Sequence, residues 1–388
     1  MVLTLFSVSL AHAEDFSFDL SDFEKRPLQL NSFVELKAEH QWLDETSAGY
    51  FLKYPDVSDL DTLDRYSGAL EVSASYQKHN WLLDFTAHAS SLDSEFENQQ
   101  DIQIYEALAK WQWDKNIRFE LGKKSIKWGK GYAWNPVAFL ERPKDPNDPE
   151  LSREGFVVAT GEWIRSGQGQ LKTLALTPTL VPVENQVNED FGEQESLNPA
   201  IKLYLLYRDI DIDFMVLADG SRSQRWGLDF SANLASNLEI HGEYARIYDY
   251  SQSLLQADNS LLSEVSDVQR YLLGLRYLTE TDLTIIAEYY YNGGGYTEQQ
   301  SELYFQLLHE AADTGDPGLE QSARAAASAG FNSANFMQSY IYLKMSQKEP
   351  FDIVYLTTSL IVIQNLQDAS YSMTPEIIYS AVTNLELR

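Results

Sequence analysis

The chain has 388 residues, 13% of them aromatic, and a formal net charge of −29 at pH 7. This charge repels polyanions and argues against nucleic acid as a partner. The sequence contains no Cys, which excludes disulfides and thiolate metal sites.

The first thirteen residues, MVLTLFSVSLAHA, are mostly apolar and end in a small-x-small pattern. We expect 1–13 to be a secretory signal peptide, although its usual basic start is missing. A short buried strand or helix is the alternative. The sequence after this segment contains no apolar run long enough for a transmembrane helix. Such an exported chain can still cross a membrane as a closed barrel.

Alternation of apolar and polar residues predicts β-strands along most of the chain. In 81–90, for example, Trp81, Leu83 and Phe85 share one face, and Asp84 and His88 lie on the other. Sixteen segments show this pattern, and the start of a seventeenth lies at 385–388. The sixteen begin near Val34, Leu70, Trp81, Tyr105, Ile117, Val157, Leu171, Ile201, Ile212, Trp226, Leu238, Tyr271, Leu283, Ile341, Val354 and Ile377.

The connections between these segments alternate in length, which is typical of an outer-membrane barrel and not of a two-sheet sandwich. Aromatic residues also flank the short turns, as in an interfacial girdle, with ordinary cross-strand pairing as the alternative. These residues include Tyr76, Trp81, Trp111, Trp113, Trp163, Tyr207 and Tyr277. Short turns are predicted at 78–80, 114–116, 166–169, 208–211, 235–237, 279–282 and 347–352. Longer connections are predicted at 41–67, 91–101, 123–154, 179–199, 219–224, 248–267, 293–335 and 365–371.

We therefore predict an all-β fold, a transmembrane antiparallel up-and-down β-barrel that forms a single domain over 14–388. Single-chain bacterial barrels have even strand numbers, so about 18 strands are favoured, with the last strand or strands missing from the sequence. The alternative is a barrel of about 16 strands with a short tail. Connection 293–335 has apolar residues at helical spacing on both sides of Gly315-Asp316-Pro317-Gly318. It is predicted to be a partly helical external loop, or else an irregular excursion.

Connection 123–154 is the most unusual, with seven of the 29 basic residues and four of the twelve prolines. Proline stiffens a loop, and this composition favours a loop folded into the lumen, its cations facing acidic walls. Such a loop would narrow the pore and set its selectivity. The loop residues assigned to the constriction are Lys123, Lys124, Lys127, Trp128, Lys130, Trp134, Arg142, Lys144 and Arg153.

Carboxylates on the polar faces of the predicted strands form the facing wall. Those assigned to the constriction are Asp84, Glu106, Glu120, Glu239 and Glu243, and the other wall acids are Glu35, Glu39, Glu71, Asp229 and Glu288. The same charges could instead form only a structural salt network, or a site for a specific anionic ligand.

Signatures of catalysis are weak. The sequence contains no nucleophile motif, P-loop, dinucleotide fingerprint or calcium loop. His88 and His241 are predicted to face the lumen, where a single His is usually a satisfied polar residue and not a ligand. We therefore expect neither an enzyme nor a cofactor or metal site.

The segment LGKKSIKWGKGYAWNPV resembles a motif in Gram-negative outer-membrane proteins of the porin and alginate-export-like superfamily. In that motif a Gly-Arg/Lys-x-x-x-x-Trp-Gly strand end leads into an Asn-Pro loop. The matching positions are Gly122, Lys123, Trp128, Gly129, Asn135 and Pro136. The resemblance is local, and it implies an outer-membrane pore or export conduit with its third long loop inside the lumen. The acidic wall departs from the basic lumen that alginate would need.

These observations predict a porin-like channel for small solutes in the Gram-negative outer membrane, narrowed by 123–154. Outer-membrane lipid and lipopolysaccharide are the expected surroundings. One alternative is a conduit of an export system with a periplasmic or inner-membrane partner. Another is a scaffold or enzyme barrel that transports nothing.

Overall fold

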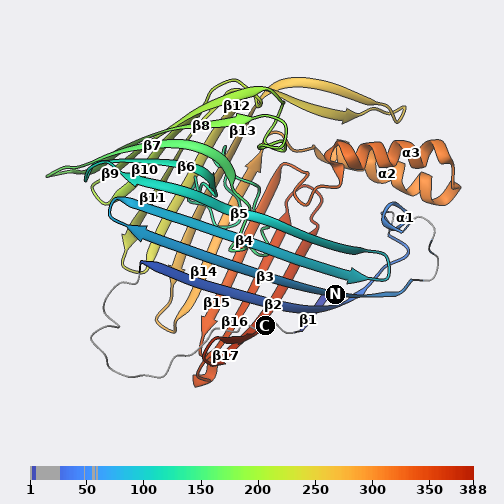
Figure 1. The fold of residues 1–388 in the computed structure, drawn as a ribbon. Helices are drawn as coiled ribbons and strands as arrows, with labels where there is room; N and C mark the ends of the chain where they lie inside the picture. The colour runs from blue at the N-terminus through green and yellow to red at the C-terminus, as the bar shows by residue number, and fades with distance from the viewer. Residues whose placement is uncertain (1, 6–26, 48, 55–56, 58–59) are drawn as a thin grey trace.

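The computed structural model describes residues 2–5, 27–47, 49–54, 57 and 60–388. Within them, one antiparallel sheet curves into a barrel, and each strand pairs with the next from β1 to β18 (Figure 1). The strands are β1 Val2–Leu5, β2 Leu28–Trp42, β3 Thr62–Lys78, β4 Trp81–Ser94, β5 Asn98–Gln112, β6 Ile117–Lys124, β7 Phe156–Ser166, β8 Leu171–Val183, β9 Ser196–Tyr207, β10 Ile210–Leu217, β11 Arg225–Ala235, β12 Leu238–Leu255, β13 Leu261–Leu278, β14 Leu283–Asn292, β15 Ser339–Lys348, β16 Leu356–Asn365, β17 Tyr371–Val382 and β18 Leu385–Leu387.

The two ends of the sheet come together on one side of the barrel. Glu35 of β2 and Glu71 of β3 line the same cavity as Glu376 of β17 and Glu386 of β18. The sequence of paired strands thus surrounds the lumen once, as the predicted all-β barrel requires.

The sixteen strands predicted from alternation correspond to β2–β17, and the predicted start of a seventeenth corresponds to β18. Strand β1 lies within the segment predicted to be a signal peptide and pairs with β2, with Val2 opposite Gln41. Residues 6–13 of that segment lie outside the described part of the chain, and its removal as a signal peptide stays a prediction.

The outer face of the sheet is an apolar band. Leu70, Val72, Leu83 and Phe85 are each at least 40% exposed, although they lie mid-strand. A soluble monomer rarely exposes so continuous an apolar surface. Aromatic residues mark the rim with the short turns, where Trp81 and Trp111 stack with their ring centroids 5.8 Å apart.

Two connections predicted to be long are mostly strand. Within 91–101 only 95–97 connect β4 to β5, and within 248–267 only 256–260 connect β12 to β13. The β12–β13 hairpin projects beyond the rim (Figure 1). In both segments polar residues interrupt the apolar faces, so the alternation is irregular and the sequence pattern predicted loops there.

Three helices lie at the rim with the long connections (Figure 1): α1 Tyr50–Lys53, α2 Glu298–Thr314 and α3 Pro317–Ala326, which a π-helical turn, η2 Ala327–Phe331, follows. A 3₁₀ turn, η3 Pro350–Asp352, lies at the opposite rim. Gly315, at φ 63°, ends α2, and the Asp316 side chain caps α3 by accepting from the Gly318 amide. Gly315 ends one helix and Asp316 begins the next, so the connection 293–338 contains a helical hairpin. None of the described helices has an apolar stretch long enough to cross a membrane.

Candidate functional site

The connection between β6 and β7, residues 125–155, lies inside the barrel and is called the inner loop here. Its apolar side chains Trp128, Val137 and Phe139 are at most 3% exposed. They pack against inward-facing residues of β7, β8, β9, β10 and β12, which include Val158, Val181, Ala200, Met215, Leu217 and Ala245. This contact is a hydrophobic core between the loop and the wall.

A second core lies further along the inner loop, around Trp134. Its indole stacks on Tyr290 of β14 with ring centroids 5.0 Å apart, and it also contacts Tyr340 and Tyr342 of β15. Leu272, Ile286, Ile361 and Ile363 of β13, β14 and β16 complete the cluster. The inner loop and the inner faces of β7–β16 that it contacts occupy one side of the lumen, which we call the filled side.

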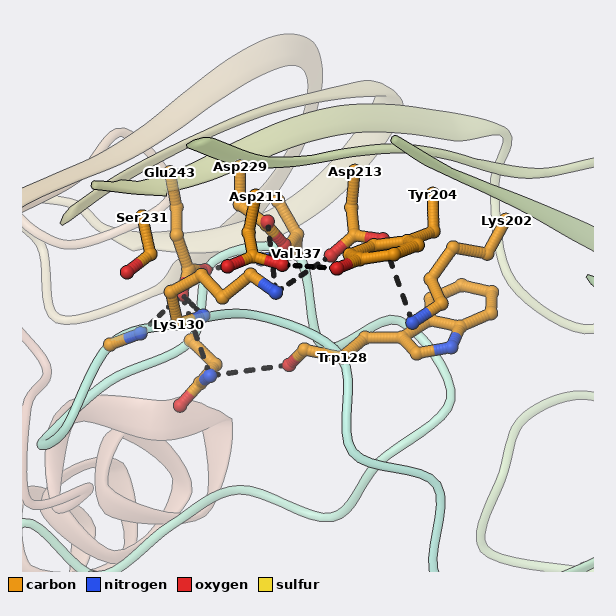
Figure 2. Close-up of polar contacts among 12 residues, drawn as sticks. Trp128, Lys130, Val137, Lys202, Tyr204, Asp211, Asp213, Asp229, Ser231 and Glu243 are labelled. Atoms are coloured by element: carbon orange, nitrogen blue, oxygen red, sulfur yellow. Dashed lines mark hydrogen bonds and ion pairs between the residues drawn. The ribbon is translucent and has the colours of Figure 1, made fainter. Parts of the chain in front are cut away.

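Glu243 of β12 anchors the loop backbone. Its carboxylate accepts hydrogen bonds from the amides of Lys130 and Gly131, each at 2.6 Å, and of Val137 at 3.2 Å (Figure 2). At Gly129, φ is +98°, and a Cβ would lie 2.7 Å from the Glu243 Oε1 atom. A side chain at this position would collide with the Glu243 carboxylate, so only glycine fits here.

Glu288 of β14 repeats this anchoring one step along the chain. It accepts from the amides of Tyr132 at 2.5 Å and Ala133 at 2.9 Å. The His241 Nε2 atom lies 2.9 Å from Glu288 Oε1, the oxygen that also accepts from the Tyr132 amide. His241 is fully buried. His241 is therefore a buried residue of the wall that pairs through Nε2, whereas its Nδ1 atom has no hydrogen-bond partner among the described residues.

Lys130 reaches the carboxylates of β10 and β11. Its Nζ atom lies 2.9 Å from Asp213 and 3.9 Å from Asp229, and Lys202 approaches Asp213 to 3.6 Å (Figure 2). Tyr204 donates its hydroxyl to Asp211 beside this group.

Most of the other predicted loop cations contact partners within the inner loop or beside it in sequence. Lys123 and Arg142 contact Glu154, and Arg142 also contacts Asp190. Lys124 contacts Glu120. Arg153 lies 3.1 Å from Glu141, and Lys144 donates to the Gly131 carbonyl at 2.7 Å. Lys127 is exposed and forms no ion pair with a described residue.

The predicted wall acids divide into two groups. One group contacts the predicted loop segment 123–154 and contains Glu120, Asp229, Glu243 and Glu288. The other does not, since Asp84 pairs with Lys110 at 2.7 Å and Glu239 accepts from Ser231 at 3.2 Å. Glu106 forms no ion pair among the described residues. The prediction left Asp213 out of the wall and Glu141 and Glu154 out of the site. Asp213 was recoverable, since it alternates with Ile212 and Phe214.

The far part of the inner loop crosses to the last strands. Thr374 of β17 donates to the Asn147 side chain at 3.2 Å, and Arg388 lies 3.3 Å from Asp148. The loop is thus held at both ends of its path across the lumen.

Three cavities formed by the described residues lie beside the inner loop. The central one, of about 920 Å³, is bounded by β2–β5, β15–β18 and the segment 147–152. It shares Glu35 and Ala69 with a cavity of about 260 Å³ towards the long-connection rim. It shares Ser346, Thr357 and Ser380 with a cavity of about 1080 Å³ at the opposite rim. We call these three neighbouring cavities together the passage.

Among the residues that the structure describes, no group of three or more His, Asp or Glu side chains could hold a metal ion. The loop carboxyl of Glu141 is buried, and burial raises its pKa to about 7 despite the Trp128 amide and Arg153.

No family model matches the chain, and no curated protein matches it in sequence. Its structure is similar to OmpF of Salmonella typhi, solved in complex with daunomycin, with a TM-score of 0.50 and 12% identity over 93% of this chain and 95% of that one. It is also similar to a triple mutant of the porin of Rhodopseudomonas blastica, with a TM-score of 0.47 and 7% identity over 93% and 98%. The chain therefore has the antiparallel barrel fold of porins. The alginate-export-like part of the resemblance stays a prediction.

Proposed function

We propose that the protein is an outer-membrane channel of a Gram-negative bacterium that lets small hydrophilic solutes through the passage and prefers cations. The observation that carries this proposal is the row of three cavities between one rim and the other, in which the central cavity shares lining residues with each of its neighbours. The apolar outer band and the aromatic rim support the membrane location.

The charges along the passage support the preference for cations. The lining contains ten carboxylates and four Lys or Arg side chains. One of the four, Arg388, is paired with both Glu376 and Asp148. A lining of one sign raises the local concentration of the opposite ion and sets pore selectivity.

The inner loop contributes little positive charge to this lining. Most of its cations pair on the filled side, as Lys130 does with Asp213, whereas Asp148 and Glu150 of the same loop face the passage. The loop therefore narrows the lumen without reversing the sign of its field.

The test is to fold the full chain into planar bilayers and record single channels under a KCl gradient. We expect steady ohmic current and a reversal potential with the sign of cation preference. Replacing Glu35 and Glu71 with Gln should reduce that preference, whereas Glu264→Gln, on the exposed β12–β13 hairpin, should leave it unchanged. Folded protein that stays silent would refute the channel, and a reversal potential of anionic sign would refute the selectivity.

A further inference from the structure

Asp213 of β10 and Asp229 of β11 face each other directly across the antiparallel ladder. Both are inside the interface between the wall and the inner loop, with exposed fractions of 2% and 0%. Side chains at such opposed positions lie close together, and two like charges there repel each other. Burial in a medium of low dielectric makes this repulsion stronger.

The lysines around this pair lie closer to Asp213 than to Asp229, and Lys202 lies 3.6 Å from Asp213. Among the described residues, neither carboxyl oxygen of Asp229 accepts a hydrogen bond, and Asp213 Oδ1 also accepts none. Lys130 lies within contact of Asp213 but 3.9 Å from Asp229. Buried carboxylates without hydrogen bonds are costly, so such a group either finds a donor or gives up its charge.

The other charged groups around the pair come from four elements. β9 contributes Lys202 and Tyr204, β10 contributes Asp211, β12 contributes Glu243, and the inner loop contributes Lys130 (Figure 2). Tyr204 is engaged with Asp211, and Glu243 is engaged with the loop amides. Two ammonium groups thus face the three aspartates of β10 and β11, while Glu243 also interacts with Lys144, so negative charge is in excess around the pair.

From this arrangement we infer that Asp213 and Asp229 form a proton-binding site that shares one proton at neutral pH. The proton makes an O–H···O hydrogen bond between the two carboxyl groups and leaves the pair with a single negative charge. Lys130 neutralises that charge, and the inner loop is thereby fixed to β10 and β11. This site does not depend on whether the barrel conducts.

Infrared spectroscopy of the full chain folded in lipid vesicles tests the inference directly. Glu141 is another buried carboxyl that is partly protonated at pH 7, so the signal is read as the difference between the wild type and each variant. At pH 7 the wild type should show, beyond that shared background, the C=O stretch of a protonated buried carboxyl, and an alkaline titration should remove it. Asp229→Asn should abolish the band, because the remaining Asp213 is then neutralised by lysine. Asp211→Asn is the matched control and should retain the band, since Asp211 already accepts from Tyr204.

Asp213→Asn distinguishes a shared proton from one held by Asp229 alone. If the proton is shared, this variant loses the band as well, because the Asn amide donates to an ionised Asp229. A band that persists in either Asp213→Asn or Asp229→Asn overturns the inference, and so does its absence from the wild type at pH 7. The band is read without any current, so its failure and the failure of the channel proposal are separate results. If one of the two variants does not fold, the other and the wild-type titration still decide.

Discussion

Two sides of the same lumen differ in the residues that the strands turn inward. On the filled side, β8 and β10 present Val181, Val183, Met215 and Leu217, all at most 1% exposed, to the inner loop. On the open side, β3 and β4 present residues such as Ser67 and Ser90 to the passage. An apolar inner face binds a loop, and a polar one stays hydrated.

Carboxylates have different roles on the two sides. Glu243 on the filled side is buried and accepts several loop amides, so it is a structural anchor. Glu71 on the open side faces the passage, 3.8 Å from His88. An acidic residue on the inner face therefore has no fixed function until the position of the loop is known.

Removing the inner loop should have the largest effect. Lys124 and Phe156 are direct partners at the ends of β6 and β7, so a tight turn can replace 126–154. Opening the filled side should raise single-channel conductance roughly twofold or more, because conductance grows with pore width. Shortening the β12–β13 hairpin is the control and should leave conductance unchanged. Equal conductance with and without the loop would mean that it does not occlude the lumen.

Trp134→Ala should destabilise the filled side most among single substitutions. The indole is 7% exposed and contacts three tyrosines, so its loss leaves a cavity worth about 3–5 kcal/mol. Urea unfolding in detergent or vesicles measures the change. Lys127→Ala, at an exposed position of the same loop, should change the free energy of unfolding by at most about 0.5 kcal/mol. Similar values for both variants would show that the Trp134 cluster is not a core.

Glu243→Ala should release the loop backbone with a smaller cost. Three amides lose their acceptor, and an unpaired buried donor costs about 1–3 kcal/mol. Water that enters the space left by the side chain replaces part of the lost bonds, so we expect a total near the cost of one unpaired donor. Hydrogen exchange should accelerate at the amides of 130, 131 and 137. In Glu239→Ala these amides should exchange as in the wild type, since Glu239 contacts Ser231 and His241 instead. Protection that survives in Glu243→Ala would contradict the anchoring role.

The smallest effect concerns pH. Burial raises the pKa of Glu141 from 4.5 to about 7, so the folded chain binds this proton more readily than the unfolded chain. Its contribution to stability is fully present below pH 4.5 and is lost as the pH rises through about 7. Glu141→Gln should therefore flatten the change in urea midpoint between these two pH values. Glu150→Gln, in an exposed part of the loop, should keep the wild-type dependence, and a variant at Glu141 that also keeps it would refute the assignment.

Much of the barrel was predictable because a strand alternates its side chains with a period of two. Segments such as 81–90 show this in sequence, and β2–β17 follow it. The prediction failed at 91–101 and 248–267, where strands continue beyond the regular part of their alternation and polar residues interrupt the apolar faces. The unusual character of 123–154 was also predictable, because this segment is rich in proline, tryptophan and basic residues.

The partners within the site were harder to predict. Lys130 lies more than eighty residues from Asp213, and Glu243 lies further still from the amides that it accepts. Such pairs depend on the curvature of the whole barrel. No local pattern distinguishes Asp213 from Asp84, because each alternates with apolar neighbours on its own strand.

The sequence by itself therefore determined the strands, their order, and the loop that would be unusual, because these follow from local periodicity and composition. Only the tertiary structure decided which side of the lumen the loop fills, which cations it neutralises there, and which carboxylates remain to line the passage. The physical reason is that these choices depend on the fit between one loop and a closed wall. That fit exists only when strands far apart in the chain surround the same space.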